Sequence, residues 1–150
     1  MEKTLKNQKI YEISESIGEL KELKAHFKFH YALNKTTKVL NAVLKNMPKY
    51  VPPKTETYEN FIKVVEDKIK TEKIKFTDMS EVSSFYEKEI ENYPEAKQDR
   101  INSLKIFKEV IEKWENDTQT IFFHSISEDL FPNEITGIQA EFLEEYFLED

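Results

Sequence analysis

Two of the three histidines, His26 and His30, lie four residues apart in the stretch KAHFKFHY. Side chains four residues apart share a face of an α-helix, which is a common way to present two metal ligands. A metal site needs three or four ligands, so His124 or carboxylates would have to complete this one. The histidines enclose Phe-Lys-Phe and not the His-Glu-x-x-His pattern of zinc peptidases, and the lysine adds positive charge. We therefore interpret the pair as partly exposed histidines at a helix junction and predict no metal site.

The elements that position these histidines are predicted from apolar spacing. In a strand, Phe27, Phe29 and Tyr31 would line one face and both histidines would point away from it. The flanking sequence favours helices, either one long helix with a shifted seam or two helices joined around His26. We expect His26 and Phe27 at a helix break, with Phe29 and Tyr31 packed inward. The apolar positions of the two series are Ile10, Ile13, Ile17 and Leu20, then Leu33, Leu40, Val43, Leu44 and Met47.

Three further helices are expected after the prolines at 48, 52 and 53. Thr55 is predicted to cap the first, and Asp78 with Glu81 forms a capping-box start for the second, which should stop before Pro94. Pro94 suits the first turn of the third helix. We expect its apolar seam to be buried against one of the first two helices; this seam consists of Leu104, Phe107, Ile111 and Trp114.

The C-terminal part breaks the helical pattern. Residues 118–126 are rich in β-branched and aromatic side chains, which predicts a strand, and residues 73–77 are the expected pairing partner. Thr136 and Gln139 have capping-box spacing for a last helix. We expect this helix to cover the strand pair with Ile138, Phe142, Tyr146 and Phe147 as its apolar face.

These elements predict a mainly α fold, built as a helical bundle or as hairpins with a minor β element near the C-terminus. With 150 residues the chain is expected to form a single domain, residues 1–150, and the segment Pro48 to Pro53 is where it would divide. The first residues show no signal-peptide pattern, and no apolar run approaches the ~20 residues that span a bilayer. We therefore expect an intracellular protein that does not enter a membrane.

Most residue patterns of catalysis are missing. The chain has no cysteine, which excludes thiol nucleophiles and thiolate metal sites, and its two glycines are isolated, which excludes a glycine-rich phosphate loop. No serine lies in a nucleophile-elbow context. We predict a non-enzymatic protein with no catalytic residue and no cofactor.

Charge is distributed unevenly along the chain. Residues 1–54 hold 11 lysines and 5 glutamates, net +6, whereas residues 55–150 carry net −13, and together they give −7. With one arginine among 22 basic residues, the chain lacks the bidentate side chains that nucleic-acid readers favour, so no direct nucleic-acid binding is expected. The acidic last helix instead indicates a surface for a protein partner. Its candidate partner-binding residues are Glu141, Glu144, Glu145 and Glu149.

Two segments, KFHYALNKTTKVLN and TIFFHSISEDLFPNEITGIQAEFLEEYFLED, carry a resemblance to a known group. Together they resemble a family of small uncharacterised tailed-phage accessory proteins, in which a lysine-rich helix junction and a C-terminal strand, turn and capped helix recur. The resemblance covers about half the chain at its two ends, and residues 50–100 would be an insertion. It implies a phage-encoded accessory protein that acts through protein contacts in the host cytoplasm or in the virion, and it implies no catalytic residue.

Three functional hypotheses follow. The first is a virion or assembly accessory that binds another protein, either a phage structural protein, a host protein or a further copy of itself. The second is an acidic inhibitor of a host nuclease or defence protein, whose carboxylates imitate the phosphates of a nucleic acid. The third is a small metal-dependent enzyme, which the ligand requirements disfavour.

Overall fold

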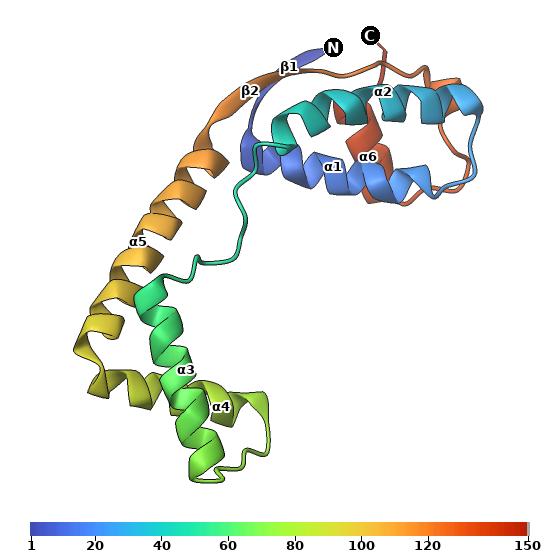
Figure 1. The fold of residues 1–150 in the computed structure, drawn as a ribbon. Helices are drawn as coiled ribbons and strands as arrows, with labels where there is room; N and C mark the ends of the chain where they lie inside the picture. Colours follow the sequence, from blue (N-terminus) through green and yellow to red (C-terminus); the bar gives the residue numbers. More distant parts are fainter. Residues whose placement is uncertain (150) are drawn as a thin grey trace. The chain divides into compact units, whose positions relative to one another are not determined.

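The computed structural model describes residues 1–149 and confirms a mainly α fold with a short β element near the C-terminus (Figure 1). The two strands lie far apart in the sequence and form one sheet. In chain order the elements are β1 (Glu2–Lys6), α1 (Asn7–Lys21), α2 (Phe27–Leu44), α3 (Glu56–Thr71), α4 (Met79–Glu89), the 3-10 turn η1 (Ile90–Asn92), α5 (Pro94–Asn116), β2 (Thr118–Phe122), the 3-10 turn η2 (Glu128–Leu130) and α6 (Gly137–Tyr146).

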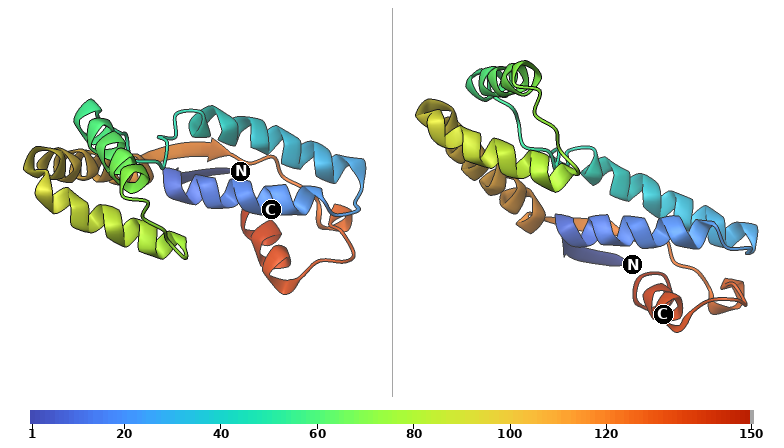
Figure 2. Two further views of the ribbon diagram at one scale, coloured as in Figure 1. Left: turned by 60° about the horizontal axis from the view of Figure 1, so that its bottom comes forward. Right: turned by 90° about the horizontal axis from the view of Figure 1, so that it is seen from below.

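The chain folds into two compact units. Unit 1 comprises Met1–Pro48 and Glu112–Asp150, and unit 2 comprises Lys49–Ile111. The first boundary falls in the proline segment where the sequence analysis placed a division of the expected single domain. Each unit has its own hydrophobic cluster. The two ends of the chain therefore build one unit, and the middle of the chain is inserted into it (Figure 2).

The histidine stretch forms a helix junction, as predicted. His26 is the N-cap of α2, and its ring Nδ1 accepts a hydrogen bond of 3.2 Å from the backbone N–H of Lys28. The strand alternative is wrong. Phe29 is buried, as expected, but Tyr31 is 59% exposed, so its predicted inward packing is wrong. Residues two apart share a face of a strand, whereas in a helix they point in nearly opposite directions.

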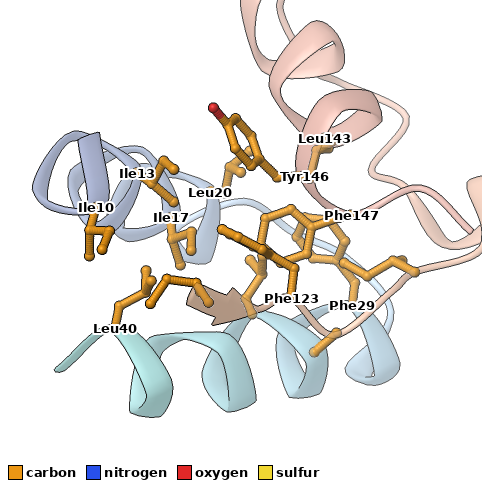
Figure 3. Packing of buried hydrophobic residues seen from close by; sticks show 14 residues of the cluster. Ile10, Ile13, Ile17, Leu20, Phe29, Leu40, Phe123, Leu143, Tyr146 and Phe147 are labelled. Carbon is orange, nitrogen blue, oxygen red and sulfur yellow. The ribbon is translucent and has the colours of Figure 1, made fainter. Parts of the chain in front are cut away.

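The core of unit 1 lies between α1, α2 and α6. Figure 3 shows Ile13 and Ile17 of α1, Phe29 of α2 and Phe147 after α6 pointing toward one another. The predicted apolar stripe of α1 is confirmed, because its four members are at most 1% exposed. Burying each such side chain contributes about 1.5–3 kcal/mol. The fully buried members are Ile10, Ile13, Ile17, Leu20, Phe29, Leu33, Leu40, Ile121, Phe123, Leu143, Tyr146 and Phe147.

The sheet joins the start of the chain to the segment after α5. β1 and β2 are antiparallel, with Glu2 opposite Phe122 and Lys6 opposite Thr118. Phe123 extends the ladder, because its N–H donates to the carbonyl of Met1 at 2.7 Å. The strand at 118–122 is confirmed, but the predicted partner at 73–77 is wrong.

The segment 73–77 fails as a strand because it closes α3. Lys73 has a φ of 53°, the left-handed conformation of a helix C-cap. The N–H of Ile74 donates to the carbonyl of Ile69, and the N–H of Lys73 donates to that of Lys70. These are the two hydrogen bonds of a Schellman motif. The alternating residues KIKF therefore follow the end of α3 and do not form a strand.

The predicted start of the last helix is confirmed, but its predicted apolar face is only partly buried. Thr136 and Gln139 form the predicted capping box, and Tyr146 is buried. Ile138, expected to cover the sheet, is 81% exposed, so that assignment is wrong. The core reaches only the later turns of α6, where Leu143 is fully buried, and Ile138 lies in the first turn.

Unit 2 is held by a much smaller core. The predicted N-caps are confirmed, because Thr55 accepts from the N–H of Tyr58 and Asp78 accepts from the N–H of Glu81. The return bond to the Glu81 carboxylate comes from the N–H of Thr77 and not from Asp78. α5 begins at Pro94, also as predicted. The buried apolar residues are Phe61, Val65 and Ala96.

The predicted buried seam of α5 is wrong. None of its four residues is fully buried, and Leu104 is 39% exposed. Ala96 lies on the same face of α5 and is buried with Phe61 and Val65, and Leu104 lines a pocket beside Tyr58 and Phe61. Apolar spacing identifies an amphipathic face, but it does not show whether the chain supplies a second face to cover it.

Candidate functional site

An open groove of about 700 Å³ lies in unit 1, beside the first turns of α2. One wall comes from α2, and the other comes from the segment that follows β2 and from the chain after α6. We call it the aromatic groove and define it by six of its lining residues. These are Phe27, Lys28, Tyr31, Phe122, His124 and Glu149.

Three large aromatic side chains of the groove are exposed. Phe27 is 70% exposed, Tyr31 is 59% exposed and Phe122 is 47% exposed. Phe27 and Tyr31 stand one helical turn apart on α2 and so share a face. Phe122 is the last residue of β2, and strand alternation turns it outward because its neighbour Ile121 is in the core. Local geometry therefore brings the three rings to one surface.

Positively charged groups lie near these rings. Lys28 lines the groove, and the Nζ of Lys35 lies 5.3 Å from the ring centroid of Tyr31. α2 carries three lysines and no acidic residue. The N-terminal ammonium donates to the carbonyl of Phe123 at 3.0 Å. Glu149 is the acidic side chain that lines the groove and offsets part of this charge.

The surroundings of His124 in the groove lower the pKa of its imidazole. Its backbone N–H donates to Thr36 Oγ1 at 3.1 Å, and its ring meets Phe122 edge-on at 5.1 Å. Burial lowers the pKa of His124 below its ordinary value, and the charges of Lys35 and of the N-terminus lower it further. The neutral imidazole is thus favoured in the folded chain.

We expect the ring resonances of His124 to titrate below the ordinary histidine pKa of about 6.5. Because the folded pKa lies below the unfolded one, the unfolded chain binds more protons in this window. The contribution of His124 to stability is therefore present above the unfolded pKa and is lost as the pH falls through the window. NMR titration measures the midpoint of the His124 ring resonances in the wild type and in Lys35→Met. The substitution should raise this midpoint because it removes a neighbouring positive charge. A midpoint at or above the ordinary value would contradict the arrangement.

The four glutamates predicted to bind a partner do not form one site. Glu141, Glu144 and Glu145 are exposed on α6, whereas Glu149 lines the aromatic groove. Glu141 and Glu145 are one turn apart, and Ile138 precedes Glu141 by three residues, so the three side chains form a ridge along one side of α6. We call Ile138, Glu141 and Glu145 the acidic ridge.

Sequence reasoning missed the aromatic groove. It selected the right stretch, residues 24–31, but assigned Tyr31 to the core and Phe122 to no surface. The signal present in the sequence is the i, i+4 pair Phe27 and Tyr31 beside a buried Phe29. Once it is known that the helix begins at Phe27, the spacing shows that Phe27 and Tyr31 share a face that does not carry Phe29.

The histidines do not assemble into a metal site in the described chain. Among residues 1–149 there is no group of three or more histidine, aspartate or glutamate side chains that could hold a metal ion. In the same part of the chain, none of the helices combines the length and apolar character of a membrane span. Comparisons of the sequence with protein-family models and curated proteins, and of the fold with solved structures, give no match.

Proposed function

We propose that this chain is a non-enzymatic protein-binding protein, an accessory protein of a tailed phage that acts in the host cytoplasm or in the virion. The observation that carries the proposal is the exposure of Phe27, Tyr31 and Phe122 around one groove. Exposed aromatic side chains that gather in one place are typical of protein interfaces, where they become the anchoring contacts. The phage origin rests on the resemblance of the two end segments.

The groove has the properties of an interface. It is open, and beside its aromatic rings it has Lys28 in the lining and Lys35 against the ring of Tyr31. Interfaces favour this composition because rings bury a large area at low entropic cost and the charged rim steers the encounter. The partner is therefore expected to present apolar side chains next to acidic ones.

Affinity capture with the tagged full chain from a lysate of infected host cells tests the proposal. The double substitution Phe27→Ala with Tyr31→Ala should reduce the captured partner about tenfold or more, because truncating two anchoring rings removes at least ~1.4 kcal/mol of binding. The matched control is Tyr11→Ala, an aromatic residue 41% exposed on α1 that does not line the groove. Equal capture by wild type and the double variant would contradict the proposal.

A second candidate function is an acidic inhibitor of a host nuclease or defence protein. It is supported by the exposure of Glu141, Glu144 and Glu145 on a helix that contains no basic residue. The same capture experiment with Glu141→Lys and Glu145→Lys distinguishes the two candidates. Loss of a basic host protein, with the groove variant unaffected, would favour the inhibitor, and loss of a phage structural protein only in the groove variant would favour the accessory protein.

A further inference from the structure

We propose that the aromatic groove of one copy binds the acidic ridge of α6 in a second copy, so that the chain associates head to tail. This inference rests on the groove being a protein-binding site, as proposed above, and names the partner as the chain itself. It joins two surfaces of unit 1 that carry exposed apolar and charged side chains.

Charge complementarity is the first argument. Lys28 lines the groove and Lys35 lies against the ring of Tyr31, on a helix without acidic residues. α6 has the opposite composition, with three glutamates and no basic residue. A groove and a ridge of opposite charge attract each other, and the attraction orients the encounter.

Apolar complementarity is the second argument. Ile138 is 81% exposed, the highest value among the exposed large apolar side chains of residues 1–149. It lies on the same side of α6 as Glu141 and Glu145, at steps of three and four residues. A helix that binds a groove presents its contacts at this spacing. In the proposed contact Ile138 packs among the rings of Phe27, Tyr31 and Phe122, and the two glutamates face the lysines.

The geometry of unit 1 separates the two surfaces within one molecule. In Figure 3, α2 and α6 lie on opposite sides of the core. The outward side of α6 therefore does not reach the groove of its own chain. A contact between two different surfaces is heterologous, so each added copy leaves a free groove and a free ridge, and rings or open chains result.

The contact is expected to be weak. A ridge of one ten-residue helix buries less surface than the roughly 1,200–2,000 Å² of a stable interface. Glu149, at the groove, also repels the incoming glutamates. Association should therefore depend on concentration and on salt, and Glu149→Gln should strengthen it.

Sedimentation velocity of the full chain from about 10 to about 500 μM tests the inference, a range suited to weak association. The mean mass of the wild type should rise above 17.9 kDa with concentration. It should fall back when salt increases from about 0.05 to about 0.5 M, because the charges are exposed. Two variants should stay monomeric. One is the groove variant, Lys28→Glu with Lys35→Glu, and the other is the ridge variant, Glu141→Lys with Glu145→Lys.

Mixing the two variants gives the sharpest test. The groove variant keeps an intact ridge and the ridge variant keeps an intact groove, and the two reversed surfaces also carry opposite charges. An equal mixture should therefore associate, although neither variant associates alone. Lys38→Glu with Lys45→Glu is the matched control, because both lysines are exposed at or just beyond α2 and neither lines the groove. This control should associate like the wild type. Circular dichroism checks that every variant is folded.

A wild type that stays monomeric over the whole concentration range would overturn the inference. Association of the groove variant equal to that of the wild type, or a mixture that remains monomeric, would also overturn it. These failures are separable from failure of the proposed function. If self-association is absent while Phe27→Ala with Tyr31→Ala still abolishes capture from the lysate, the groove binds a different protein.

Discussion

Replacing Phe123 by alanine is expected to lower the free energy of unfolding of unit 1 by about 3–5 kcal/mol. Phe123 is 0% exposed, and its ring meets Tyr146 at 5.2 Å and Phe147 at 5.8 Å between centroids. It also continues the sheet through its hydrogen bonds with Met1. The substitution therefore leaves a cavity where the sheet and the end of α6 meet. Urea denaturation followed by circular dichroism measures the change.

The neighbouring phenylalanine is the matched control. Phe122 has the same chemistry and lies one residue earlier, but it is 47% exposed and faces the groove. Phe122→Ala should cost less than about 1 kcal/mol, as is usual at surface positions. Because a one-residue shift in strand register exchanges the two faces, the pair of variants also tests the register. Equal losses, or a larger loss for Phe122→Ala, would contradict the pairing of Glu2 with Phe122.

Replacing Phe61 by alanine is expected to unfold unit 2 while unit 1 stays folded. Phe61 is 3% exposed, and its ring meets those of Tyr58, Tyr86 and Tyr93 at centroid distances of 5.3–6.3 Å. Truncating a buried phenylalanine costs about 3–5 kcal/mol. Unit 2 has 63 residues and contains only two other buried apolar side chains, and a core of this size supplies little more stability than that loss.

Hydrogen exchange followed by mass spectrometry distinguishes the two units. In the Phe61→Ala variant the amides of α3 and α4 should lose protection, and those of α1 and α2 should keep it. Val64→Ala is the control, because Val64 lies on the same helix and is 47% exposed. It should leave the exchange of both units close to that of the wild type. Simultaneous loss of protection in α1 and α3 would show that the units fold as one.

The helices and most of their ends can be predicted from the amino-acid sequence. The stripe of α1, the caps Thr55, Asp78 and Thr136 and the start of α5 at Pro94 were all predicted from a few neighbouring residues. These features are local because helical hydrogen bonds join residues four apart and a cap acts within the first turn. Their prediction needs no knowledge of the rest of the chain.

The pairing of the strands, in contrast, depends on contacts between distant parts of the chain. β1 contains one apolar residue, Leu5, among polar and charged ones, so its sequence carries no strand signal. It becomes a strand because β2, more than a hundred residues away, pairs with it and the hydrophobic core packs against the sheet. Residues 73–77 alternate better but close a helix. Pairing between distant segments depends on where the helices place them, which no local pattern records.

The candidate binding surfaces also differ in whether local sequence predicts them or packing between elements creates them. The sequence alone placed Glu141, Glu144 and Glu145 on an exposed acidic helix, since carboxylates at a surface need no partner within the chain. It could not show that Tyr31 and Ile138 are exposed, because an apolar residue is buried only if another element covers it. α2 turns Phe29 inward and Tyr31 outward, and the core ends before it reaches Ile138. Packing between elements therefore decided which apolar side chains remain available to a partner.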